Sequence, residues 1–555
     1  MTTTNFKTVC MTTTISNKVL FISFIVLLSG CSKKLDQYPQ TDLSDQNFWN
    51  TTNDMKLACN YLYSFLPDIT TKTDDDMSVD AFAQVANPVS NGSRLPPSTS
   101  TDWSNDYTLI RACNNILEKS VKVTGSAVDI NKYLGETRFF RAWAYFDLVK
   151  RFGDVPLILK TLLLTDTALY SSSTNRSIII DSIYADLDFA TANLPLSNAQ
   201  AAEEYGRITA SAALAFKSRV ALFEGTRQKF FGYGHYQTHL QVALDASNQL
   251  ISSGSNGLYS DATHPDSSYY YLFQYSGEGM ANPENILVRI YGENEINDIS
   301  SNNYTRSVLD EGALTPTGNI VADYLYKDGL PKDKSPYYQT QTDTYTEFEN
   351  RDPRMAMSIF NKYSWYVSGL YVPTFEYTQT GYRSCKYYIA ADWVVNVSYI
   401  DNIIIRYAEV LLNNIEAKFE LGGSVSDQDL NNTINLIRAR SGMPALTNSF
   451  VSANGLDMRS EIRRERRIEF AFEGLRYWDL LRWKTAETEL PQQVVGAKYF
   501  PAEQGPLANP NLTPDGLVIV EEAANRKFNP IRDYLWPIPT KEIGLNKNLQ
   551  QNPNW

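Results

Sequence analysis

The stretch LGETRFFRAWAYFDLVKRFGDVPLI, residues 134–158, determines how this chain can fold. Four of its apolar residues recur every three or four positions and so share one face of a helix: Phe139, Trp143, Phe146 and Val149. Gly153 is suited to end that helix, and Pro156 follows shortly after it. The stretch therefore predicts an amphipathic helix over 134–152, whose aromatic face another element must cover.

Helical periodicity returns along most of the chain and comes in neighbouring pairs. The further segments that predict helices are 55–66, 103–120, 178–194, 208–223, 403–421, 426–441 and 456–483. Alanine recurs in 208–223, which allows a neighbouring helix to approach closely, and Gly225 is expected to end this helix. The pair 403–421 and 426–441 has tetratricopeptide proportions, and such pairs stack because none buries its apolar face alone. We therefore expect an all-α, helical-repeat scaffold.

Residues 254–400 do not follow this helical rhythm. Tyrosines cluster there among Ser, Gly, Asn and Asp, and short runs such as 286–291 are strand-like. We expect this region to consist of loops with a few short strands, inserted into the helical scaffold. Loops held on a rigid scaffold are where ligand recognition usually occurs.

The first residues have the layout of a secretory signal that ends in a bacterial lipobox. A short apolar run follows Lys18 and leads into Leu-Ser-Gly-Cys, whose last residue is Cys31. The run is too short for a helix that spans the ~30 Å apolar core of a bilayer, which needs about 20 residues. We interpret residues 1–30 as a signal peptide and Cys31 as the lipidated first residue of the mature chain. Residues 31–50 then form a tether, and residues 51–555 form a single domain. The alternative is an ordinary secretory signal with a chance cysteine.

The composition argues against one class of partner and favours another. The formal net charge is −12, which argues against binding to nucleic acid and against electrostatic adhesion to anionic lipid. The chain has 35 Tyr and 9 Trp, more than a core usually needs. These side chains combine a flat apolar face with a polar tip, which suits contact with sugars, peptides or a protein partner.

Signals for catalysis or metal binding are weak. His235 and His239 are four residues apart, but HYQTH lacks the glutamate of a zinc-protease motif, so we interpret them as a surface pair. Neither a nucleophile-elbow motif nor a phosphate-binding loop occurs in the sequence. Acidic residues are numerous, so their number alone does not exclude a glycosidase that uses two carboxylates. The acidic string 74–76 could supply oxygen ligands to a structural calcium ion, although a solvated loop is the favoured interpretation.

Five strings of sequence span nearly the whole chain after the signal. The first begins at Leu134, and the others are YGRITASAALAFKSRVALFEG (205–225), RYAEVLLNNIEAKFELGG (406–423), IRRERRIEFAFEGLRYWDLLRW (462–483) and YLWPIPTKEIGLNKNLQQNPNW (534–555). The short string DPRM, residues 352–355, fits with them. Together and in this order, they closely resemble the SusD/RagB family of outer-membrane nutrient-binding lipoproteins.

The resemblance implies a fold, a partner and a location. The scaffold is expected to comprise about four tetratricopeptide-like helix pairs, with ligand-binding loops at about 254–400. The expected partner is a SusC-like TonB-dependent transporter, over which the lipoprotein sits as a lid. Ligands in the family are mostly oligosaccharides, with peptides in some members, and neither catalysis nor a cofactor is expected. The chain is then lipid-anchored at the outer membrane and faces the exterior, although Lys33 and Lys34 stand where such lipoproteins often have acidic residues.

The resemblance also points to candidate ligand contacts near the early helices and in the middle region. Sugar rings stack on aromatic faces, and their hydroxyls need carboxylate and amide partners. The candidates are Asp76, Trp103, Tyr107, Tyr269, Tyr270, Tyr275, Tyr291, Asn303 and Tyr304. Trp103 is the strongest of them because it lies at a polar junction between loop and helix, although it could instead pack against the helix end.

The family strings themselves are predicted to be structural. Acidic and basic residues three apart can pair along the helix of 462–483 and beside it: Glu461 with Arg464, Glu473 with Arg476, and Asp479 with Arg482. A charge-paired helix that locks the repeat stack is favoured over an anion-binding site, and Trp143 is assigned to the core. The sequence thus predicts an oligosaccharide-binding lipoprotein. Peptide or glycopeptide binding and a lipid-anchored glycosidase are the alternatives.

Overall fold

Helix α4 (Ala127–Phe152) is the aromatic helix that residues 134–152 predict. In the computed structural model, the Ser126 hydroxyl caps its start by accepting a hydrogen bond from the Asp129 backbone N–H at 3.1 Å. Gly153 ends it with a φ of 74°, a left-handed angle that glycine adopts readily. Three members of the predicted apolar face are buried: Phe139, Phe146 and Val149.

The structure describes residues 48–292 and 301–555. The chain divides into two units, Met1–Asn50 and Thr51–Trp555, and the second holds all the helices and strands named in this section. Cys31 and the predicted signal peptide lie outside the described residues. Within the described ranges, no helix is both long and apolar enough to cross a membrane.

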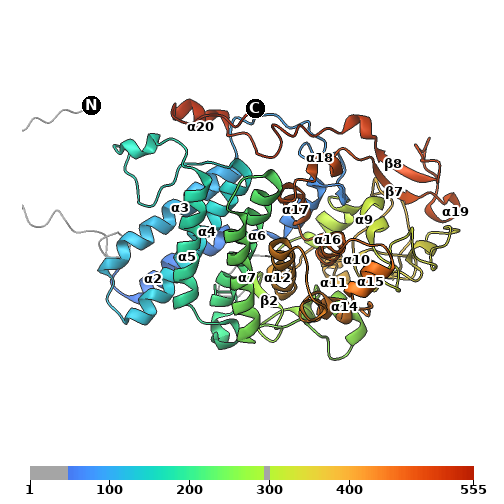
Figure 1. The fold of residues 1–555 in the computed structure, drawn as a ribbon, viewed down its shortest axis with the longest axis horizontal. Coiled ribbons are helices and arrows are strands. Elements are labelled where there is room, and N and C mark those ends of the chain that lie inside the picture. The colour runs from blue at the N-terminus through green and yellow to red at the C-terminus, as the bar shows by residue number, and fades with distance from the viewer. Residues whose placement is uncertain (1–47, 293–300) are drawn as a thin grey trace, which may run out of the picture. The chain divides into compact units, whose positions relative to one another are not determined.

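Long helices lie side by side across the scaffold (Figure 1). They are α3 (Thr101–Lys119), α4, α5 (Arg176–Asn193), α6 (Ala210–Phe231), α7 (Tyr236–Ser253) and α12 (Tyr407–Gly422), and each contacts the next. Helix α2 (Thr52–Leu62) packs against α3 and α4. This stacking of helices confirms the predicted all-α, tetratricopeptide-like fold. Helix α7 has no counterpart among the predicted segments, and its His239 is buried rather than on the surface.

Helix α6 continues beyond Gly225, its predicted end. It runs to Phe231 and ends at Gly232, which has a φ of 73°. A Cβ atom at Gly225 would lie 2.8 Å from Cγ of Leu240 on α7. This glycine therefore allows α7 to approach α6 closely and does not terminate the helix.

Two of the predicted helices near the C-terminus are divided. The first residues of 403–421 belong to strand β6 (Asn402–Arg406), which pairs antiparallel with β2 (Asn285–Arg289). Residues 426–441 form two short helices: α13 (Asp427–Asn431) and α14 (Ile434–Arg440). Strand β2 confirms the strand-like run at 286–291, and its pairing ties the middle region to the start of α12.

The predicted helix 456–483 also breaks. It forms two helices: α16 (Met458–Glu469) and α17 (Arg476–Arg482). In the connection, Phe472 and Gly474 have φ angles of 63° and 77°, which no α-helix contains. A Cβ atom at Gly474 would lie 2.8 Å from the carbonyl oxygen of Thr71, in the 3₁₀ helix η2 (Ile69–Met77). The close approach of η2 therefore leaves no room for a side chain at this glycine.

The remaining named strands pair in two-stranded sheets, and short helices connect the rest. The pairs are β1 (Ala81–Phe82) with β3 (Thr315–Pro316), β4 (Trp365–Tyr366) with β5 (Gly369–Leu370), and β7 (Val494–Lys498) with β8 (Leu517–Glu521). The short helices are α8 (Ser268–Tyr271), α9 (Gly318–Asp323), α10 (Pro353–Ser358), α11 (Ala390–Val395), α15 (Asn448–Ala453), α18 (Ala486–Glu489), α19 (Pro501–Gln504) and α20 (Thr540–Leu545). The prediction of a loop-rich region with a few short strands is confirmed.

The region 254–400 contributes to a hydrophobic core that the sequence did not predict. Tyrosines supply much of it: Tyr259, Tyr269, Tyr291, Tyr304, Tyr324, Tyr371, Tyr382, Tyr387 and Tyr388. Ile468 and Phe472 from the C-terminal part of the chain pack into the same cluster. Much of the tyrosine excess therefore serves packing rather than recognition.

Candidate functional site

A polar cleft of about 460 Å³ lies where the early helices meet strands β2 and β6. We call it the central cleft. Its lining comes from η2, α3, α4, α6, the two strands and the α16–α17 connection. Side chains in its walls include Asp74, Asn105, Asp106, Trp143, Asp147, Lys150, Arg289, Asn402 and Trp478. Aromatic rings combined with carboxyl and amide groups suit a ligand rich in hydroxyls.

Trp143 provides an aromatic surface in the central cleft. Its ring stacks on Phe216 of α6, with the centroids 4.7 Å apart and the planes at 28°. The side chain is only half-buried, whereas Phe139 and Val149 on the same helix are fully buried, and it lines the cleft. The assignment of Trp143 to the core is therefore only partly correct, because the ring both packs against α6 and faces the cleft.

Two polar groups of the cleft keep unused hydrogen-bonding capacity. Asp106 is 8% exposed, and its Oδ2 has no hydrogen-bond partner among the described residues. Burial and the nearby Asp147 carboxylate raise the pKa of Asp106 well above its ordinary value, which favours the protonated acid. Asn402 donates from Nδ2 to the carbonyl of Pro67 at 2.9 Å, but its buried Oδ1 has no partner in the described ranges. A ligand hydroxyl would satisfy such atoms, which otherwise cost about 1–3 kcal/mol each.

The charges on α4 compensate each other. Asp147 accepts a hydrogen bond from Lys150 Nζ at 2.6 Å and also pairs with Arg151. Burial alone would raise the pKa of Asp147, but Arg151 and Lys150 bring it well below its usual range. The same two cations lie 4.4 Å and 5.1 Å from the ring centroid of Trp478. Trp478 is therefore covered, and Trp143 is the more accessible of the two cleft tryptophans.

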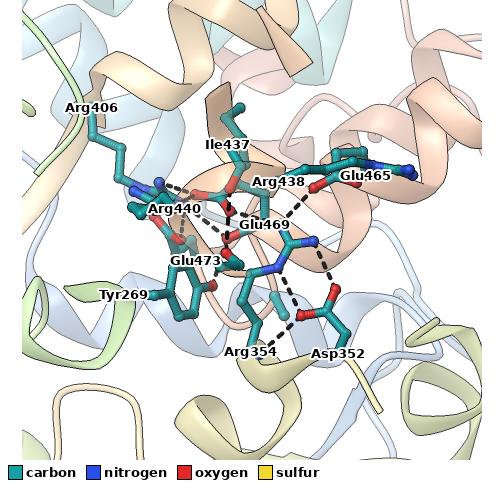
Figure 2. Close-up of polar contacts among 12 residues, drawn as sticks. Tyr269, Asp352, Arg354, Arg406, Ile437, Arg438, Arg440, Glu465, Glu469 and Glu473 are labelled. Atoms are coloured by element: carbon teal, nitrogen blue, oxygen red, sulfur yellow. Dashed lines mark hydrogen bonds and ion pairs between the residues drawn. The ribbon is translucent and has the colours of Figure 1, made fainter. Parts of the chain in front are cut away.

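Behind the cleft, the end of α16 lies in a buried ionic network (Figure 2). The Glu469 carboxylate accepts hydrogen bonds from Arg406 Nη1 at 2.5 Å and from Arg354 Nη1 at 2.9 Å, and it also pairs with Arg440. Tyr269 donates its hydroxyl to the Glu469 carbonyl oxygen at 2.7 Å. Burial alone would raise the pKa of Glu469, but the three guanidinium groups hold it well below its usual range.

Glu473 connects this network to the central cleft. Its carboxylate accepts hydrogen bonds from Arg406 Nε at 2.9 Å and Nη2 at 2.7 Å, and from Lys386 Nζ at 2.6 Å. Burial would raise the pKa of Glu473, but Arg406 and Lys386 lower it to about 2. The residue also lines the cleft. The cations of the network are thus paired within the protein, as the structural interpretation of the charged string predicts.

Two of the three ion pairs predicted between residues three apart are present: Glu461 with Arg464 at 3.4 Å and Asp479 with Arg482 at 2.8 Å. The prediction of the third pair, Glu473 with Arg476, is wrong. Arg476 instead lies 3.5 Å from Asp80. The cause is the break at Gly474, which removes the helical geometry that would bring these two side chains together.

The buried carboxyl group of Asp75, on η2, should make the stability of the folded chain depend on pH. Burial and the Asp80 carboxylate raise the pKa of Asp75 from 3.8 to about 7. The folded state therefore prefers the protonated acid, so the stability that this group contributes is present below its unfolded pKa and is lost as the pH rises through about 7. Between about pH 4 and pH 8, the free energy of unfolding of the native chain should fall by roughly 2–4 kcal/mol more than that of Asp75→Asn.

Urea unfolding of both chains across this pH range measures the difference. Asp266→Asn, at an exposed position, is the matched control and should follow the native chain. Parallel curves for the native chain and Asp75→Asn would show that Asp75 does not titrate in this way.

Trp103 and Tyr107 line a different pocket, of about 470 Å³. Trp103 is only 5% exposed, and Tyr107 donates its hydroxyl to a backbone carbonyl at 2.9 Å. Arg111 and Asn114 in the same lining also donate to backbone carbonyls, those of residues 158–162. These polar side chains hold the loop that follows α4, which leaves a mainly apolar pocket beside the two aromatic candidates.

Three other candidates are buried in the core: Tyr269, Tyr291 and Tyr304. Tyr291 is 5% exposed and donates its hydroxyl to Asp68 Oδ2 at 2.8 Å. The Tyr269 hydroxyl donates to the backbone carbonyl of Glu469 in the ionic network. Their burial makes these three packing residues, which corrects the interpretation of them as ligand contacts.

The remaining candidates are half-buried or exposed: Tyr270, Tyr275, Asn303 and Asp76. Tyr275 is 41% exposed and donates its hydroxyl to Asp392 at 2.8 Å. Asp76 accepts a hydrogen bond from Asn87 Nδ2 at 2.7 Å, and burial raises its pKa to about 7. All four lie outside the lining of the central cleft, and ligand contact by them stays a prediction.

The acidic string 74–76 does not converge on one point. Asp74 lines the cleft, Asp75 accepts a hydrogen bond from the Arg476 backbone N–H at 3.3 Å, and Asp76 faces Asn87. Across residues 48–292 and 301–555, no group of three or more His, Cys, Asp or Glu side chains is placed to hold a metal ion. The structure therefore offers no support for a calcium site at this string.

Sequence reasoning missed Trp143 as a cleft residue, although α4 carries a signal for it. Asp147 and Lys150 follow Trp143 at helical spacing, so the three side chains share one face. Charged residues on an otherwise aromatic helix face indicate that this part of the face is accessible to solvent. Asp106 and Asn402 carry no such signal, because only the fold brings them to the cleft.

Comparisons with known proteins agree with this architecture. The chain matches two family descriptions, "SusD family" over residues 283–555 and "Starch-binding associating with outer membrane" over residues 35–222. SusD-like protein P38 of Formosa agariphila is 27% identical over 497 residues, which cover 84% of this chain and 92% of that protein. SusD-like protein P2 of the same organism is 25% identical, over 96% of this chain and 98% of that protein.

A solved structure extends the likeness to three dimensions. The crystal structure of a SusD-like carbohydrate-binding protein from Bacteroides fragilis matches this chain with a TM-score of 0.75 at 26% identity. The match covers 91% of this chain and all of that one. The two family matches lie in separate parts of the chain and together span most of it, and the fold agrees with both. The chain therefore belongs to the SusD family.

Proposed function

We propose that the protein captures an oligosaccharide in the central cleft and delivers it to a SusC-like TonB-dependent transporter. The observation that carries the proposal is the half-buried ring of Trp143 in a cleft where Asp106 and Asn402 have buried oxygens without partners among the described residues. A sugar ring can stack on the indole while its hydroxyls bind these oxygens. In support, the Bacteroides fragilis relative is named a carbohydrate-binding protein, and another solved relative is named a laminarin-binding SusD-like protein.

Calorimetric titration of the full-length chain, purified in detergent, tests this proposal. The panel contains neutral and charged polysaccharides and a set of mixed peptides. Saturable binding to at least one polysaccharide, with no binding to the peptides, is expected. Binding to the peptides alone would contradict the proposal in favour of peptide capture.

The anchor and the transporter belong to the same proposal. Lipidation of Cys31 would hold the chain at the outer membrane, facing the exterior, with the barrel beneath it. The loop between α4 and α5 carries exposed apolar side chains suited to a protein contact: Leu159, Leu163, Leu164, Leu169 and Tyr170. Co-purification of the chain with a barrel transporter from outer membranes is the expected result. A chain that is extracted alone under mild conditions would contradict the partnership.

A glycosidase is the alternative from another class, and the cleft contains one feature of such an enzyme. Asp106 has a raised pKa and Asp147 a lowered one, as in the acid and base of a two-carboxylate site. However, Lys150 and Arg151 already engage Asp147, which leaves it unsuited to attack a sugar or to activate water. Incubation with the bound polysaccharide should release no reducing ends. Release that Asp106→Asn abolishes would establish hydrolysis instead.

A further inference from the structure

A second pocket, of about 270 Å³, lies beside strand β2. It is formed by residues 197–209 before α6, by 255–256 after α7, and by 280–288, which lead into β2. It shares no lining residue with the central cleft. It is therefore a separate cavity, which we call the amide pocket.

The lining of the amide pocket combines apolar and polar side chains and carries no free charge. Most of its polar side chains are amides and hydroxyls: Asn198, Gln200, Thr209, Asn256, Asn282 and Asn285. Arg207 also lines the pocket, but it donates to both carboxylate oxygens of Glu136, at 3.0 Å and 2.6 Å, and to Asn60 Oδ1 at 2.7 Å. Its charge is thus neutralised behind the wall. An uncharged ligand suits this lining better than an acid or a base.

Two of these amides, Asn285 and Gln200, retain unused hydrogen-bonding capacity. Asn285 donates from Nδ2 to the Gly277 carbonyl at 3.1 Å and to the Tyr205 hydroxyl at 3.3 Å. Its Oδ1 is buried and has no hydrogen-bond partner within residues 48–292 and 301–555. Gln200 donates from Nε2 to the Arg207 carbonyl at 3.0 Å, which leaves its Oε1 as an acceptor. The wall therefore presents acceptors to a ligand that brings hydroxyl donors.

Size and shape restrict the ligand further. The volume of 270 Å³ lies below the ~300–1,000 Å³ of sites that enclose a drug-sized molecule, so one ring fits and a chain of rings does not. Tyr205 is half-buried in the lining and offers a flat surface beside the amides. We propose that the amide pocket binds a single uncharged sugar residue, as a second glycan site. The sugar class rests on the proposed function.

Ligand-observed NMR titration of the full-length chain in detergent tests this assignment. The probes are D-glucose, D-galactose and D-mannose, with D-glucuronate as a charged counterpart. At least one neutral sugar should bind saturably, and glucuronate should not bind at the same concentration. Ala281→Trp, at an exposed position in the lining, should weaken the neutral sugar at least tenfold because the indole fills the pocket.

Three further variants make the result specific. Ala202→Trp, exposed but outside the lining, is the matched control and should bind as the native chain does. Asn285→Leu should weaken binding as Ala281→Trp does, because it removes the open acceptor. Trp365→Ala, at an exposed tryptophan in neither lining, should leave monosaccharide binding unchanged.

The inference is overturned if no neutral monosaccharide binds, if glucuronate binds equally well, or if Ala281→Trp leaves the affinity for the neutral sugar unchanged. Failure here is separable from failure of the proposed function. A chain that still binds a polysaccharide through the central cleft retains that function and loses only the second site. A chain that binds a neutral monosaccharide but no polysaccharide loses oligosaccharide capture instead.

Discussion

Replacement of Glu469 by glutamine should lower the free energy of unfolding by about 3–5 kcal/mol. The carboxylate is fully buried and shared by Arg406, Arg354 and Arg440 (Figure 2). An amide keeps the shape of the side chain but removes its charge, so these guanidinium groups lose a common counter-ion in a place that water does not reach. Uncompensated buried charge is among the costliest defects in a fold.

Urea denaturation followed by circular dichroism measures this effect. Glu203→Gln, at an exposed position, is the matched control and should change the free energy by less than about 0.5 kcal/mol. A loss under about 1 kcal/mol for Glu469→Gln would mean that the network tolerates the missing charge and does not hold the C-terminal helices in place.

Trp143→Ala should weaken binding of the captured oligosaccharide by about 30-fold, which corresponds to about 2 kcal/mol. The variant removes the aromatic surface of the central cleft while Asp106, Asn402 and the ion pairs of α4 remain. Sugar stacking is lost, and the hydrogen bonds alone must hold the ligand. Calorimetry with the polysaccharide identified from the panel gives the ratio of affinities.

Loss of packing must be separated from loss of the ligand surface, because Trp143 also stacks on Phe216. Trp143→Phe retains a ring at this position and should lose less affinity than the alanine variant. Trp365→Ala removes a tryptophan that is 63% exposed and lies outside the cleft, and it should bind normally. Unchanged affinity in Trp143→Ala, with a normal melting curve, would contradict the assignment of the cleft.

The scaffold could be predicted from sequence because its signals are local. The three- and four-residue spacing around Phe139 and the stop at Gly153 depend only on neighbours along the chain. The errors occur where a distant segment overrides that local pattern. Gly225 has the character of a helix end but lies mid-helix, where it leaves room for Leu240. The segment 456–483 breaks at Phe472 and Gly474, where Thr71 comes close to the glycine.

The site was harder to predict because its residues come from distant parts of the chain. Asp106 on α3 and Asn402 at the start of β6 reach one cleft only after the helices stack. A sequence also cannot show whether an aromatic residue among polar neighbours faces solvent. Tyr304 illustrates this, since it has a polar neighbourhood in the sequence but is 1% exposed in the fold.

Glu473 limits how this protein can diverge. The residue belongs both to the ionic network and to the wall of the cleft, so a change there that alters the ligand also disturbs the fold. Asn105 and Trp143 lie in the same cleft but outside the network, and they can be replaced at lower cost. New ligand preferences should therefore arise by substitution on the α3 and α4 side of the cleft, while the wall at Glu473 stays fixed.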